Sequence, residues 1–198
     1  QPSLKKCVID FFLTFLAKPS TFSDAIIVQD SETKMYFLSK AIQRKKLKNL
    51  IQNPNQIFEI TKDVTKSEKW STRKAVVDIF IDIAKNIQDQ DIINQLTELC
   101  ITLLKDEAAP VRESAAIQLA AFTNADNIEQ NFPQFLTELE ESDYFRHRQA
   151  AIDLLHALYM KTSSQSTKEF LISHISKFTR DPVQNVVEYA NYVLNKNE

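Results

Sequence analysis

The segment NQLTELCITLLKDEAAPVRESAAIQLAAF, residues 94–122, decides the fold. Its apolar residues recur every three or four positions on both sides of a short polar stretch, DEAAP, at residues 106–110. This spacing is typical of two amphipathic helices, because side chains three or four positions apart lie on one face of a helix. Pro110 lies where the second helix would begin, a position that tolerates a residue without an N–H. The segment therefore predicts two helices joined by a tight turn.

The same pattern recurs along the chain. The aligned positions are Arg73, Arg112, Arg148 and Gln184, which are separated by 39, 36 and 36 residues. The residues three and ten positions after each of them, and nine and thirteen positions before, are apolar in all four units. Offsets of three and ten share one helical face, and the two preceding offsets share a face of another helix. Each unit is thus predicted to contain two amphipathic helices.

One such unit cannot bury its apolar faces alone, so successive units are expected to stack in a row. We therefore predict an all-α fold, a right-handed α-solenoid of about five helix pairs. Residues 1–53 are expected to form a degenerate first helical unit, and residues 54–198 the regular repeats of one continuous solenoid. The expected helices span residues 4–17, 32–51, 54–66, 71–87, 91–104, 110–123, 132–140, 145–161, 167–178 and 182–195. In place of glycine, the helix ends are expected to use Asn86, Asn124, Lys161 and Asn195.

Glycine is absent from the 198 residues, and its absence argues against several common enzyme folds. Phosphate-binding loops, dinucleotide-binding turns and nucleophile elbows all need glycine, as do most tight β-hairpins. The two cysteines are too few for a disulfide framework and lie in apolar segments, which indicates buried thiols in a reducing compartment. No apolar run reaches the length of a transmembrane helix, about 18 residues.

The net charge of −2 conceals an uneven distribution. Up to Ala75 there are 14 basic and 7 acidic residues, whereas from Val76 onward there are 10 and 19. Such a chain can meet a basic partner at one end and an acidic partner at the other, or it can simply carry solvated helix faces. The most basic segment also has two interpretations: it could bind phosphate groups or an import receptor, or it could form a solvated helix face. Its basic residues are Lys40, Arg44, Lys45, Lys46 and Lys48.

No arrangement of side chains in the sequence predicts catalysis. The three histidines lack the i, i+4 spacing of paired metal ligands on a helix: His147, His156 and His174. One group of acidic residues is predicted to form a solvated turn, because no enclosed general acid accompanies it: Glu138, Glu140, Glu141 and Asp143. We therefore predict that the protein is not an enzyme and holds no metal and no cofactor.

Aromatic residues mark two of the predicted turns. Trp70 and Phe145 each lie three residues before the aligned arginine of their unit, and Tyr144 adjoins Phe145. Beside Lys69 or Arg146 they could anchor a partner, because aromatic side chains dominate the energetics of many interfaces. The alternative is that they cover the helix ends against the next unit.

The repeats resemble the HEAT-repeat family over roughly residues 54–195. The segment quoted above carries Asp106, Val111 and Arg112 in the D-x4-V-R spacing of that family, followed by Ala115 and Leu119. The resemblance implies a ladder between neighbouring units, in which a turn acid meets a helix arginine. Its members here would be Arg73, Asp106, Arg112 and Arg148, whereas Asp143 is displaced by one residue and Gln184 carries no charge.

Within that family, residues 69–80 and 103–122 are similar to consecutive repeats of the scaffold subunits of protein phosphatase 2A and the regulatory subunits of phosphatase 4. This resemblance implies a non-catalytic scaffold whose intra-repeat turns hold phosphatase catalytic and regulatory subunits. The matching turns are residues 67–71, 105–110, 141–145 and 177–182. Partner-binding residues on them would be Lys69, Trp70, Lys105, Asp106, Glu107, Glu141, Tyr144, Lys177 and Arg180.

Two other kinds of HEAT-like protein share this period. A transport adaptor of the importin or adaptin kind would bind basic or tail-like peptides through the acidic C-terminal half. A DNA glycosylase would need a basic groove, which the acidic half opposes. We expect other proteins as partners, among them a phosphatase catalytic subunit, and neither nucleic acid nor a membrane span. The expected location is the cytoplasm, with the nucleus as a second compartment.

Overall fold

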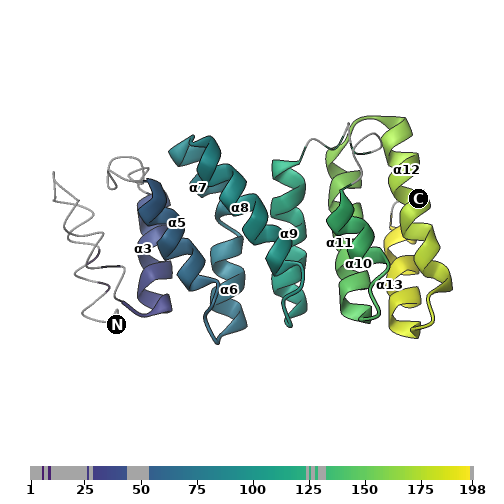
Figure 1. Ribbon diagram of the computed structural model, residues 1–198, viewed down its shortest axis with the longest axis horizontal. Coiled ribbons are helices and arrows are strands. Elements are labelled where there is room, and N and C mark those ends of the chain that lie inside the picture. Colours follow the sequence, from purple (N-terminus) through teal and green to yellow (C-terminus); the bar gives the residue numbers. More distant parts are fainter. Residues whose placement is uncertain are drawn as a thin grey trace. The chain divides into compact units, whose positions relative to one another are not determined.

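A computed structural model describes residues 6, 9, 26, 29–43, 54–123, 125, 128 and 133–196. Within these residues the structure is helical and has no strand, which confirms the predicted all-α class (Figure 1). The helices are α3 (Ser31–Gln43), α5 (Pro54–Val64), α6 (Trp70–Val77), α7 (Phe80–Ile87), α8 (Gln90–Leu103), α9 (Ala109–Phe122), α10 (Gln134–Glu140), α11 (Phe145–Lys161), α12 (Gln165–Lys177) and α13 (Gln184–Asn195). A 3-10 helix, Phe178–Arg180, follows α12. Most of the expected helix 4–17, and residues 44–51 of the next, lie outside the described residues.

The chain divides into two compact units, Gln1–Leu99 and Cys100–Glu198, and the division falls within α8. The boundary expected between residues 53 and 54 lies inside the first unit. In this unit α3 packs against α5, α6 and α7. Its core contains large side chains that are at most 1% exposed: Phe37, Leu38, Ile57, Ile60, Phe80 and Ile83. Burial of each such side chain stabilises the fold by about 1.5–3 kcal/mol.

In the second unit α11 is the central helix, and it packs against α9, α10, α12 and α13. Both α9 and α11 bury alanines, among them Ala115 and Ala151, and side chains this small allow neighbouring helices to approach closely. A polar contact joins α10 to α12, where His174 Nδ1 lies 2.7 Å from Glu140 Oε1. Cys100 is a buried free thiol, and burial raises its pKa.

The helix expected over residues 71–87 is interrupted, which corrects the prediction of one continuous element. Ile79 leaves the helical region, with φ −104° and ψ 6°, and its N–H bonds the carbonyl of Val76 at 3.3 Å. This is the tighter i to i−3 pattern of a 3-10 turn. The interruption follows two β-branched residues, Val76 and Val77, whose side chains crowd the preceding turn of a helix.

The helix ends also differ from expectation. Within the described residues only Gln88 has a positive φ, 56°, and it ends α7 in the left-handed conformation two residues after the expected Asn86. Helices α9 and α11 end instead at threonines in extended conformation, Thr123 and Thr162, which need no glycine. Lys161 is still helical, and Asn124 lies outside the described residues.

Candidate protein-interaction surface

The turns between paired helices are built alike. Arg73, Arg112 and Arg148 each donate from Nη1 to a carbonyl oxygen of the residue six positions earlier, at 2.8, 2.9 and 2.6 Å. Arg73 and Arg112 also bond the next carbonyl, of Glu68 and Glu107, at 3.2 and 3.0 Å. Charged donors make strong hydrogen bonds, so each guanidinium fixes the backbone of the turn before its own helix.

The last turn shifts the repeat register by three residues. Asp106 Oδ1 accepts a 2.8 Å bond from the Ala108 N–H, and Asp181 Oδ1 accepts an equal bond from Val183. Asp181 therefore matches Asp106, and the residue six positions later is Val187. Val187, and not the aligned Gln184, takes the position that arginine holds in the other three turns. Pro182 consequently precedes the N-cap Val183 instead of opening the helix.

Two successive turns of the second unit are joined by one ion pair. Arg148 donates from Nε and Nη2 to the two carboxylate oxygens of Asp181, at 2.6 and 2.8 Å. The side chains are 10% and 4% exposed, so solvent screens this pair little. The guanidinium holds the pKa of Asp181 below its usual range. Since Arg148 also bonds the carbonyl of Ser142, it ties its own turn to the following one.

We define the turn row as the three turns of the second unit at residues 105–108, 141–144 and 177–183, which lie at the lower ends of α9, α11 and α13 in Figure 1. Six of the expected binding residues there are exposed: Lys105, Glu107, Glu141, Tyr144, Lys177 and Arg180. Asp106 is half-buried and bonded within its turn. A depression of about 420 Å³ separates the second and third turns, with Arg148 and Asp181 among its lining residues.

Tyr144 is the most prominent aromatic residue of the turn row, at 46% exposed. The Arg146 guanidinium lies 5.7 Å from its ring centre, and the His147 ring meets it edge-on at 5.0 Å. His147 Nδ1 lies 3.0 Å from Ser142 Oγ, and burial lowers the pKa of this histidine. These neighbours hold the ring in place but leave nearly half of it exposed. That exposure is what the interpretation of Tyr144 as an anchor for a partner requires. Phe145 is half-buried.

The two remaining expected residues belong to the first unit. Trp70 is 49% exposed at the start of α6. Lys69, just before it, forms an ion pair with Glu32 of α3, and the hydrogen bond to that carboxylate raises the pKa of Lys69. Of the basic run, Lys40 bonds Gln43 at 3.1 Å, whereas residues 44–48 lie outside the described residues.

Another polar contact of the second unit, between α11 and α13, is not predicted by the sequence. Asp153 of α11 accepts a hydrogen bond from the Tyr189 hydroxyl of α13. Burial raises the pKa of Asp153 to about 6. The partners are 36 residues apart, a repeat-length separation that the sequence does contain, but no motif marks an Asp–Tyr pair.

No protein-family model and no curated protein matches the chain. Among solved structures, the crystal structure of an engineered protein is similar over 96% of this chain and 95% of that chain, with 12% identity and a TM-score of 0.37. Within the described residues, no helix is long and apolar enough to cross a membrane, and no cluster of three or more His, Cys, Asp or Glu could hold a metal ion.

Proposed function

We propose that the chain is part of an open, HEAT-like α-solenoid and acts as a non-catalytic scaffold for other proteins. The turn row is the proposed docking edge, and a phosphatase catalytic subunit is the proposed partner. A docking edge needs successive turns held at fixed spacing, because flexible contacts lose entropy on binding. The observation that carries the proposal is the Arg148 side chain, which bonds the carbonyl of one turn and the acid of the next.

The exposed side chains of the turn row suit a protein partner. Tyr144 offers a ring that is already held by its neighbours, so little rotamer entropy would be lost when a partner covers it. Glu141 flanks it on one side, while Lys177 and Arg180 carry positive charge on the next turn. An aromatic centre with charged side chains at its margin is the usual composition of a protein interface.

Binding of the purified full chain to a purified catalytic subunit of phosphatase 2A or 4, followed by calorimetry, tests the proposal. Tyr144→Ala should weaken binding by about 1–3 kcal/mol, which is roughly 5- to 150-fold in Kd. Tyr192→Ala is the matched control, because Tyr192 is 60% exposed on α13 and lies outside the turn row. Its Kd should remain within about twofold of the original. Absence of binding, or equal effects of the two changes, would contradict the proposal.

A further inference from the structure

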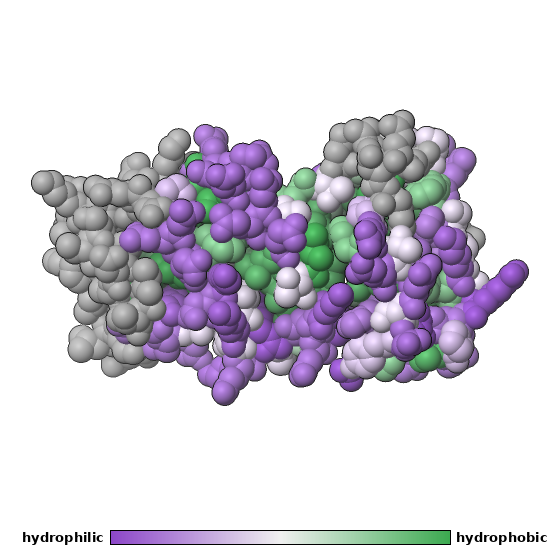
Figure 2. All heavy atoms as spheres, viewed as in Figure 1, coloured by the Kyte–Doolittle hydropathy of each residue, from purple (hydrophilic) through white to green (hydrophobic). Residues whose placement is uncertain are grey.

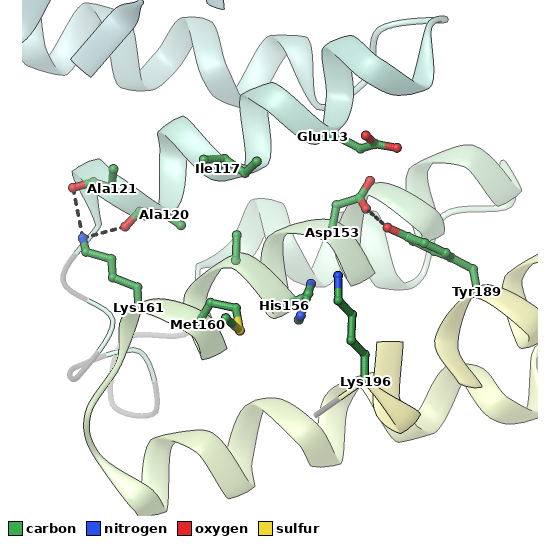
Figure 3. Close-up of a pocket in the computed structure, with 11 residues that line it drawn as sticks. Glu113, Ile117, Ala120, Ala121, Asp153, His156, Met160, Lys161, Tyr189 and Lys196 are labelled. Atoms are coloured by element: carbon green, nitrogen blue, oxygen red, sulfur yellow. Dashed lines mark hydrogen bonds between the residues drawn. The ribbon is translucent and has the colours of Figure 1, made fainter. Parts of the chain in front are cut away.

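A groove of about 570 Å³ lies in the second unit between α9, α11 and α13 (Figure 3). Helix α9 lines it with Glu113, Ile117 and Ala120, which share one face because they follow one another at intervals of four and three residues. Helix α11 repeats the pattern with Asp153, Ala157 and Met160. Each helix thus presents one carboxylate and two apolar side chains to the groove, which His156, Lys161 and Lys196 also line.

Among the described residues of the second unit, none covers the apolar part of the groove. Five large hydrophobic side chains are exposed in the described part of the chain, and three of them belong to this region. Ile117 and Met160 line the groove and are 59% and 68% exposed. Tyr192, at 60%, stacks on the groove residue Tyr189 with ring centres 6.4 Å apart. Figure 2 shows one face of the molecule, on which hydrophilic side chains predominate. Exposed apolar side chains gathered in one region are typical of a binding site.

The acidic end of the groove holds two carboxylates that form no close ion pair. Asp153 points toward Tyr189; the charge of Glu113 adds to the rise in its pKa, whereas the more distant Arg112 opposes that rise. Within the described residues, neither carboxylate has a basic nitrogen within 4.0 Å. Lys161 donates to the carbonyls of Ala120, Ala121 and Thr123, at the other end of the groove. Lys196 reaches over the groove from the end of α13.

We propose that this groove binds a helical segment of another protein that presents one Lys or Arg to Glu113 and Asp153 and two apolar side chains to Ile117 and Met160. The positive charge complements the two carboxylates, and the apolar pair covers the exposed side chains. From residue 113 to residue 120, α9 rises about 10 Å, so two turns of a partner helix fill the groove. The site lies on helix faces and is separate from the turn row.

Fluorescence anisotropy of the full chain with two labelled model peptides tests this inference. Both peptides are amphipathic helices of about 16 residues with two leucines one turn apart. One carries lysine a further turn away and the other carries glutamate there. The lysine peptide should bind at least about tenfold more tightly. Glu113→Gln combined with Asp153→Asn should abolish that preference, and Ile117→Ser with Met160→Ser should weaken both peptides.

Tyr144→Ala is the control in the turn row and should leave peptide binding unchanged. Circular dichroism and thermal unfolding establish that each variant folds, and Glu113→Gln alone supplies a milder change at an exposed position. Equal affinity for the two peptides, or binding insensitive to the groove variants, would overturn the inference. So would a dimer in sedimentation equilibrium that Ile117→Ser dissociates, because the occupant would then be a second copy of the chain.

Discussion

An arginine lies near the start of the second helix in each of the first three described turns, and Arg148 is the one that needs a guanidinium most clearly. Arg112 donates from Nη1 alone to two consecutive carbonyl oxygens, whereas Arg148 uses Nε, Nη1 and Nη2 to reach a carbonyl and a carboxylate at once. A lysine ammonium cannot offer several donors in one fixed plane. The sequence shows the spacing of these arginines. It does not show which carbonyl oxygens accept their hydrogen bonds, because every residue carries a backbone carbonyl.

Asp153 makes stability depend on pH in a direction opposite to most carboxylates. Burial raises its pKa from the ordinary 3.8 to about 6. Between these values the folded state keeps a proton that the unfolded state has released, so the contribution of this group to stability falls as pH rises from about 4 to above 6. We expect Asp153→Asn to raise the free energy of unfolding, relative to the original chain, more at pH 7.5 than at pH 4. The two changes should differ by at most about 3 kcal/mol. Urea denaturation at both pH values measures this difference.

Tyr189→Phe provides the complementary control for that experiment. The Tyr189 hydroxyl bonds the carboxylate and thereby lowers the pKa of Asp153, so its removal should steepen the loss of stability with rising pH. A stability difference between the original chain and Asp153→Asn that is the same at both pH values would contradict the assignment.

Helix α13 shows how an element can be predicted while its register is not. The stretches APVR and DPVQ look equivalent, and they place Pro110 and Pro182 at matching positions. In the structure, Pro110 lies in the first turn of α9, whereas Pro182 precedes the cap of α13. The difference comes from Asp181, whose carboxylate bonds the Val183 N–H and also receives Arg148. The Asp181–Val183 bond is local, whereas the contact with Arg148 joins residues 33 positions apart, and local spacing does not contain that contact.

The end of α7 yields a prediction about a single backbone conformation. Gln88 has φ 56° and ψ 38°, a region that costs a residue with a Cβ more than it costs glycine. Gln88→Gly should therefore stabilise the protein by about 0.5–1 kcal/mol, after the greater freedom of glycine in the unfolded chain is subtracted. Lys85→Gly, at an exposed helical position of α7, should destabilise it by a similar amount. Thermal unfolding compares the two, and a loss of stability in both would contradict the left-handed conformation.

For the whole molecule, the sequence predicted where the helices lie along the chain but not how they pack against one another. Hydrophobic periodicity located α5 through α13 to within a few residues, with α6 and α7 predicted as one helix, because each buries one apolar face. The candidate turn residues were found in the same way, since they fall between periodic segments. The sequence did not predict that Glu113 and Asp153 lie close together in the groove, because their proximity depends on how α9 and α11 pack. Stacking of the units into one row remains a prediction.

That row is tested most directly by small-angle X-ray scattering of the full chain in solution. A compact globular protein of 198 residues would have a radius of gyration of about 16 Å. Five helix pairs in a row, with neighbouring helices about 10 Å apart, would raise the radius of gyration only to about 17 Å, but they would form a row about 50 Å long whose largest interatomic distance is about 60 Å. An asymmetric distance distribution with a tail that reaches about 60 Å is the result we predict. A symmetric distribution that ends near about 42 Å would show a closed bundle and contradict both the open solenoid and its docking edge.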